Sequence, residues 1–302
     1  MEIIKQSINI NFVGNMKLWF AISITGIVIS IASVILHGGL NLGIDFAGGT
    51  LVQVKFQQAT TTEKLRNALD PIKLGSSIIQ QFSDREVVIR TAESSTDLKG
   101  LSTRIEEALS SAYGKGSIDI RRVEVVGPKV GKDLTQKAVL AIVFSWIGML
   151  IYIAWRFEFR YAVGGIVALI HDVILTIGAL SLLDKEFTLT IVAALLTIIG
   201  YSINDTIVVC DRIRENLRKS SKKDFGEIIN GSINETLSRT ILTSLTVFIV
   251  VVILFFLGGE VIHDFAFAMM VGVFVGTYSS IFIATPIVLA WEKISPSKMR
   301  RK

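Results

Sequence analysis

Six long runs of apolar residues divide the chain. They cover residues 18–36, 138–155, 161–183, 187–210, 240–259 and 265–291. A helix needs roughly 20 apolar residues to cross a hydrocarbon core of about 30 Å, so each run is long enough to span a membrane. The pattern predicts a first helix within residues 1–36, a five-helix bundle over 137–292 with a polar loop at about 211–239, and a basic tail at 293–302.

The stretch 37–136, between the first two runs, has a different pattern. Apolar and polar residues alternate from Val52 to Phe56, as a half-buried strand requires. Apolar residues around Leu65 and around Ile105 have the spacing of one helix face, and three further short apolar stretches are typical of strands. The order β-α-β-β-α-β predicts a ferredoxin-like α+β domain, one antiparallel sheet covered by two helices.

Composition agrees with a membrane protein and argues against several other classes. The mean hydropathy of +0.57 lies beyond that of ordinary soluble domains. The net charge of +5 would suit nucleic-acid binding, but the basic residues fall at the ends of the apolar runs, so we expect membrane lipid and no nucleic acid as a partner. The single cysteine, Cys210, excludes an intramolecular disulfide. With no nucleophile–base pair, Cys/His cluster or phosphate-binding lysine motif, we expect neither an enzyme nor a metal or cofactor.

Lysine and arginine in short loops favour the cytoplasm and so set the orientation of the helices. Positive charge gathers in alternate loops and in the tail: Arg156, Arg160, Arg212, Arg214, Arg218, Lys219, Lys222, Lys223, Arg239, Lys293, Lys298, Arg300, Arg301 and Lys302. The turn after the third run has only Lys185, next to Asp184 and Glu186. The bias predicts that both termini are cytoplasmic, that the 211–239 loop is cytoplasmic, and that 37–136 is extracytoplasmic.

Ionisable residues inside apolar runs are functional candidates, because each costs about 2.5–3.5 kcal/mol at a helix centre. Asp205 is the strongest candidate. It lies in the fourth run beside Asn204, with Tyr201 one helical turn before it on the same face. A carboxyl in this position could exchange a proton with one aqueous side at a time. The alternative is a polar residue that only hydrogen-bonds one helix to another.

Two further positions have ambiguous roles. His171 and Asp172 are adjacent in the third run, so on a helix they point about 100° apart and cannot both face one partner. One of them would take part in a proton relay and the other would make a structural hydrogen bond. Hydrogen bonds between subunits would explain the pair equally well. Arg239 begins the fifth run, where a long basic side chain could simply reach the membrane surface.

Small residues mark two kinds of position. Pairs spaced four apart predict close helix packing in the third and sixth runs, at Gly164 and Ala168 and at Gly272 and Gly276. The segment GIDFAGGT after the first run holds Gly43, Asp45, Gly48 and Gly49. These glycines would let the chain leave the membrane and enter the sheet, while an anion cradle is the alternative.

Five motifs follow one another along the chain. They are GIDFAGGT after the first run, WRFEFR after the second, ALIHDVILTIG in the third, GYSINDTIVVCDRIREN in the fourth and SINETLSRTILTS leading into the fifth. In this order the chain resembles the SecF branch of the SecD/SecF family of protein-export membrane proteins, over almost its whole length. SecD proteins usually carry a much larger extracytoplasmic region, and SINETLSRT is typical of SecF.

The resemblance implies a half-transporter of the resistance-nodulation-division superfamily in the bacterial inner membrane. Its six helices would pair with six of SecD, and the pair would work with the SecYEG channel and SecA. It would use the proton gradient to complete the export of unfolded polypeptides. The family's aspartate in GYSIND corresponds to Asp205, and its arginine near that aspartate corresponds to Arg239; both are assigned to proton movement.

Two other functions compete with this reading. A small-molecule or lipid exporter of the same superfamily usually has twelve spans and two extracytoplasmic inserts, whereas this chain has six predicted spans and one insert. A passive scaffold of the translocon would not need Asp205 inside an apolar helix. Both comparisons favour the motor subunit.

Overall fold

The computed structural model describes residues 9–91, 98–220 and 223–294. The chain forms two compact units, Leu42–Ala138 and Met1–Asn41 with Val139–Lys302. Each unit is described by itself.

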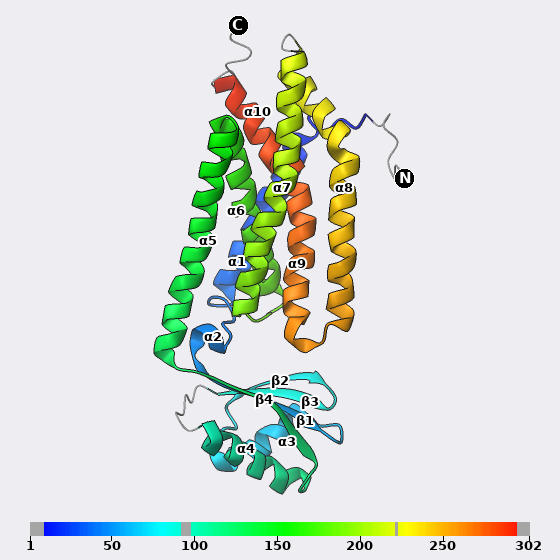
Figure 1. The fold of residues 1–302 in the computed structure, drawn as a ribbon. Helices are drawn as coiled ribbons and strands as arrows, with labels where there is room; N and C mark the ends of the chain where they lie inside the picture. Colours follow the sequence, from blue (N-terminus) through cyan, green and yellow to red (C-terminus); the bar gives the residue numbers. More distant parts are fainter. Residues whose placement is uncertain (1–8, 92–97, 221–222, 295–302) are drawn as a thin grey trace. The chain divides into compact units, whose positions relative to one another are not determined.

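The larger unit is a helical bundle (Figure 1). Its helices are α1 (Met16–Leu36), the greater part of α5 (Pro128–Arg156), α6 (Phe159–Leu182), α7 (Leu189–Lys219), α8 (Phe225–Leu257), α9 (Glu260–Ser279) and α10 (Thr285–Ile294), with a π-helical segment, η2 (Ser280–Ala284), between the last two. Six helices are long and apolar enough to span a membrane when Val261–Ile294 is counted as one. The prediction of six spans is confirmed.

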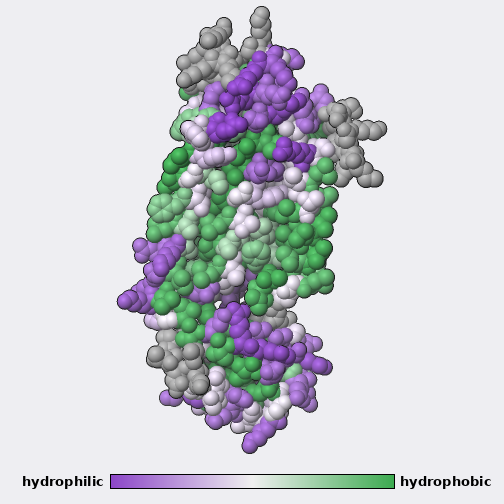
Figure 2. Space-filling model, viewed as in Figure 1, coloured by the Kyte–Doolittle hydropathy of each residue, from purple (hydrophilic) through white to green (hydrophobic). Residues whose placement is uncertain are grey.

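The core of the bundle lies among α6, α7 and α9. In the most apolar windows of α6 and α7, 56% of the residues are buried, against 6% in α5, which therefore keeps most of its surface free for lipid or a partner. Figure 2 shows the result as a broad hydrophobic belt, with hydrophilic side chains at the end where α7 and α8 meet.

Two boundaries in the bundle differ from the sequence prediction. The helix of the second span begins at Pro128 and not near 138, and its first turns are mostly polar and belong to the smaller unit. The predicted loop at about 211–239 is helical over most of its length, since α7 runs on to Lys219 and α8 starts at Phe225. Asp224 caps α8 by accepting a hydrogen bond from the Gly226 amide.

The sixth span is interrupted where the sequence predicts one continuous helix. Pro286 has no amide hydrogen and would clash with the carbonyl four residues earlier in a regular helix. The wider π turn of η2 precedes it and accommodates this defect.

The smaller unit is the predicted ferredoxin-like domain. Its elements are α2 (Ile44–Ala47), β1 (Gly49–Phe56), α3 (Thr62–Leu69), η1 (Asp70–Ile72), β2 (Ile78–Ser83), β3 (Glu86–Thr91), α4 (Leu98–Tyr113) and β4 (Ile118–Val126). The antiparallel sheet has the order β2-β3-β1-β4, and α3 and α4 cover one face (Figure 1). Val52 pairs with Ile89 and Val123 in the core. The fold prediction is confirmed.

The glycine-rich segment forms a tight connection into the sheet. Gly48 and Gly49 have φ angles of +75° and +120°, which strain any residue with a Cβ. A Cβ at Gly131, in the first turns of α5, would lie 2.7 Å from the carbonyl oxygen of Phe46. The start of α5 therefore packs directly on α2, and the positive φ angles account for glycine at positions 48 and 49.

Candidate functional site

Asp205 lies in the middle of α7 and is only 2% exposed. Two hydroxyl groups of α8 face its carboxylate: Thr243 Oγ1 is 3.4 Å from Oδ1, and Ser244 Oγ is 3.4 Å from Oδ2. Both distances are at the long end of the hydrogen-bond range, so the carboxyl is held loosely. Ser244 Oγ also lies 2.7 Å from Thr277 Oγ1 on α9. Asp205 thus joins α7 directly to α8 and, through Ser244, indirectly to α9.

The hydroxyls around Asp205 have other partners within reach. Thr243 Oγ1 also donates to the carbonyl oxygens of Arg239 and Thr240, at 3.0 and 2.9 Å, while Ser244 has Thr277. Each hydroxyl can therefore leave Asp205 without losing all of its hydrogen bonds. This arrangement suits a carboxyl that changes its charge.

The other predicted neighbours of Asp205 lie at different distances from it. The Tyr201 hydroxyl is buried near Ser244 and Thr277 without a hydrogen bond of full geometry among the described residues. The positive charge of Arg239 acts on Asp205 through space, but in the described part of the chain no ion pair joins them. Arg239 and Asn204 are both exposed on the surface of the bundle.

A second buried carboxylate, Asp172 on α6, has much firmer partners. It is completely buried and its Oδ2 accepts from Ser202 Oγ of α7 at 2.5 Å and from Ser279 Oγ of α9 at 2.9 Å. His171 Nδ1 lies 3.0 Å from Oδ1. Asp172 therefore ties together the three helices that form the core of the bundle.

The His171–Asp172 pair differs from the sequence expectation in one respect. The two side chains contact each other, because the imidazole bends back to the neighbouring carboxylate. His171 Nε2 is buried without a hydrogen-bond partner among the described residues, and the ring stacks on Tyr278. Asp172 alone reaches the neighbouring helices, through Ser202 and Ser279.

A buried ion pair links α6 to α10 at the end where the basic loops gather. Arg160 Nη1 pairs with Glu292, and the two side chains are 3% and 6% exposed. Arg160 also has Glu158 at 3.4 Å and donates to the Tyr161 hydroxyl at 3.1 Å. The sequence alone indicates for Arg160 only a role in setting the orientation of the helices, and gives no sign of this ion pair.

The small residues lie where helices approach closely. A Cβ at Gly272 of α9 would come within 2.2 Å of the Ile198 side chain, and one at Gly276 within 2.9 Å of Ser202 Cβ, both on α7. A Cβ at Gly164 would lie 2.9 Å from the Ala284 carbonyl oxygen. Ala168 packs in the same region against Ile283 and Ala284.

Sequence reasoning missed the hydroxyl residues that complete both clusters: Ser202, Thr243, Ser244, Thr277 and Ser279. Their signal is weak, because serine and threonine are common in membrane helices and usually bond to their own backbone. Thr243 and Ser244 end the SINETLSRTILTS motif and Ser202 lies in the GYSIND motif, but nothing local links them to Asp205 or to Asp172. In the described part of the chain, no group of three His, Cys, Asp or Glu side chains is placed to hold a metal ion.

Comparison with known proteins agrees with this architecture. A family model described as "Protein export membrane protein SecD/SecF, C-terminal" matches residues 105–294, and one described as "SecD/SecF GG Motif" matches residues 33–60. "Protein translocase subunit SecF" of Calditerrivibrio nitroreducens is 50% identical over 95% of this chain and 96% of its own length. The SecF of Magnetococcus marinus is 45% identical over 99% of this chain and 97% of its own.

A solved structure shows the same fold. The crystal structure of SecDF from Thermus, "a translocon-associated membrane protein", superposes with a TM-score of 0.86 at 38% identity over 96% of this chain. The match covers only 40% of the length of that SecDF chain. With family models, relatives and fold in agreement, the chain belongs to the SecD/SecF family of protein-export membrane proteins.

Proposed function

We propose that this chain is a non-enzymatic accessory subunit of the Sec export pathway, which pairs with SecD and uses the proton gradient to complete translocation. Relatives that match nearly end to end are named SecF translocase subunits. The solved SecDF chain is much longer than the part that this chain matches. A separate SecD chain would supply the remainder.

The surface of α7 supports a partner in the membrane. Apart from Leu189 at its first position, the exposed residues in the apolar part of α7 follow one face and are small or polar: Thr190, Ala193, Thr197, Gly200 and Asn204. Figure 2 shows a paler strip within the green belt on the side where α7 lies in front. Lipid tails give no hydrogen bonds to Asn204, whereas small and polar residues are typical of contacts between membrane helices. We infer that SecD covers this face.

Asp205 is the observation that carries the proton-driven function. When ionised, its carboxylate can accept from both Thr243 and Ser244 and draw α8 towards α7. When protonated, it no longer needs both donors, and the hydroxyls can turn to the Arg239 carbonyl and to Thr277. Proton binding would therefore bias the contact between α8 and the core. Exposed Arg239 would stabilise the ionised form.

The charge bias places the α7–α8 connection and both termini in the cytoplasm and the ferredoxin-like domain on the far side. In this orientation the domain would meet the polypeptide as it emerges. The SecYEG channel, with SecA on the cytoplasmic side, would be the translocon with which the pair associates. The membrane is then the bacterial inner membrane.

The test is the Asp205→Asn variant in sealed membrane vesicles with SecD present. Asparagine cannot bind and release a proton, while one proton moving through 100 mV supplies about 2.3 kcal/mol. We expect normal assembly with SecD and normal SecA-driven entry, but loss of the completion of translocation that the gradient stimulates. Asp211→Asn, on an exposed residue of the same helix, is the matched control. Full gradient stimulation in Asp205→Asn would rule out proton transfer at Asp205 and favour a scaffold.

A further inference from the structure

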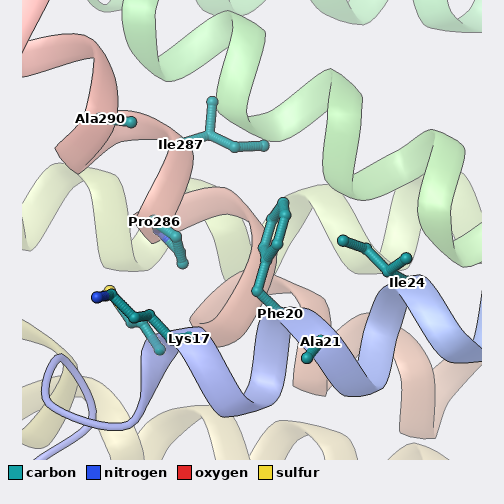
Figure 3. Close-up of a pocket in the computed structure, with 8 residues that line it drawn as sticks. Lys17, Phe20, Ala21, Ile24, Pro286, Ile287 and Ala290 are labelled. Carbon is teal, nitrogen blue, oxygen red and sulfur yellow. The ribbon is translucent and has the colours of Figure 1, made fainter.

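An apolar groove runs between the first and last helices of the bundle, apart from both carboxylate clusters. It has a volume of about 440 Å³, within the range of about 300–1,000 Å³ that is usual for ligand pockets. Phe20, Ala21 and Ile24 of α1 form one wall, and Pro286, Ile287 and Ala290 of α10 form the other (Figure 3). The groove is open to the outside, since Phe20 is 39% and Ile24 50% exposed.

One lysine marks the end of this groove. Among the described residues that line the groove, Lys17 is the only polar one, and Figure 3 shows its side chain at the end opposite Ile24. Lys17 is exposed and has no ion pair in the described part of the chain. The first turn of α1 contains no acidic residue. Glu292 on α10 is buried against Arg160.

A second basic residue lies on α10, which forms the opposite wall of the groove. Lys293 lies on α10 three residues beyond Ala290 and is also exposed. Lys17 in the first turn of α1 and Lys293 in the last turn of α10 thus place two ammonium groups near the same end of the groove, neither with an ion pair among the described residues. Uncompensated lysines beside apolar surface attract an anionic headgroup at the membrane boundary.

We propose that this groove is a binding site for an anionic phospholipid, with an acyl chain between α1 and α10 and the phosphate at Lys17. A transmembrane helix of a partner does not fit the same space. A helix has a diameter of about 10–12 Å, so one helical turn would already fill about 440 Å³. A single acyl chain is thin enough to lie along the whole groove.

The experiment is native mass spectrometry of the full-length chain in complex with SecD, delipidated and then titrated with phosphatidylglycerol or with phosphatidylcholine. We expect retention of phosphatidylglycerol over phosphatidylcholine. Lys17→Gln should weaken phosphatidylglycerol retention about fivefold, equivalent to about 1 kcal/mol for one lysine at an anionic surface. Ala290→Trp should fill the groove and abolish retention of both lipids. Lys219→Gln, on an exposed lysine at the end of α7, is the matched control and should have no effect.

Two further arms separate lipid from other occupants. Soluble glycerophosphoglycerol has the same headgroup without acyl chains and should not compete; full competition would mean a phosphate site and would overturn the proposal. A photo-crosslinking residue at Ile24, in whole membranes, should yield a lipid adduct. An adduct with a protein, or unchanged phosphatidylglycerol retention in Lys17→Gln, would equally overturn it.

Discussion

Asp172 and Asp205 are both buried carboxylates, yet their surroundings differ at the level of single bonds. Asp172 is fixed by two serine hydroxyls at 2.5 and 2.9 Å and by His171, whereas both hydroxyls facing Asp205 are 3.4 Å away. Short bonds from donors on three helices resist any change of position, and long bonds permit it. We infer that Asp172 is a fixed point of the bundle and Asp205 the group that responds to protons.

This difference predicts how Asp172 variants behave. Asp172→Leu would leave Ser202, Ser279 and His171 without their acceptor inside the bundle. Hydrogen bonds between membrane helices average about 0.6 kcal/mol, so losing the two from Ser202 and Ser279 should lower the free energy of unfolding by about 1 kcal/mol. Asp172→Asn keeps an acceptor oxygen and should cost less than half as much. Thermal unfolding in detergent measures both, and equal losses would contradict the assignment as a hydrogen-bonding centre.

The ion pair of Arg160 and Glu292 gives a second prediction at this scale. Glu292→Gln leaves a buried guanidinium with only Glu158, at 3.4 Å, to offset its charge. Breaking one side of a buried pair costs about 3–5 kcal/mol, whereas apolar replacement of both sides is often tolerated. We therefore expect a large loss of thermal stability in Glu292→Gln and recovery in Arg160→Met with Glu292→Met. A double variant less stable than the single one would show that the pair is net stabilising.

At the scale of elements, the close approach of α7 and α9 depends on glycine. Gly272→Ala would place a methyl group within 2.3 Å of two side-chain carbons of Ile198, which is completely buried. Overpacking of this kind costs about 1–3 kcal/mol. Adding Ile198→Ala to Gly272→Ala should restore part of the lost free energy of unfolding, which an unfolding assay measures. Gly148→Ala on α5, where no atom lies within 4 Å of the new Cβ, is the control and should be neutral.

Elements with a strong local pattern could be predicted from the sequence. The apolar runs located all six spans, and alternation located β1 because Val52, Val54 and Phe56 are buried on one face. The helical extension of α7 was not predicted because its polar residues resemble a loop. In the structure Arg212 pairs with Glu215 within α7 and with Glu235 of α8. The π turn before Pro286 has no periodic signal at all.

The candidate site was predictable only in part, for a similar reason. Charged residues in apolar runs stand out, so Asp205, His171 and Asp172 could be found one by one. Their partners could not, because Ser244 and Thr277 meet only when α8 and α9 pack together. The sequence likewise could not predict which face of α7 stays exposed, because that depends on how the neighbouring helices pack around it.

At the scale of the whole molecule, the orientation rests on where the positive charges lie after folding. Arg212 and Lys219 are on the α7 extension and Lys293 is at the end of α10. Arg160 is different, because its side chain is buried in the bundle against Glu292 and Glu158. The remaining bias still favours a cytoplasmic α7–α8 connection.

Cysteine labelling with a membrane-impermeant reagent tests this orientation in intact cells. The background is Cys210→Ala, since Cys210 is the only native cysteine and is buried. Asp84→Cys, in the exposed turn between β2 and β3, should react in intact cells if the domain between α1 and α5 is extracytoplasmic, as we propose. Ser220→Cys, directly after α7, should react only once the membrane is opened. The reverse pattern would invert the topology and would place the ferredoxin-like domain on the side from which SecA acts, where it could not receive the emerging polypeptide.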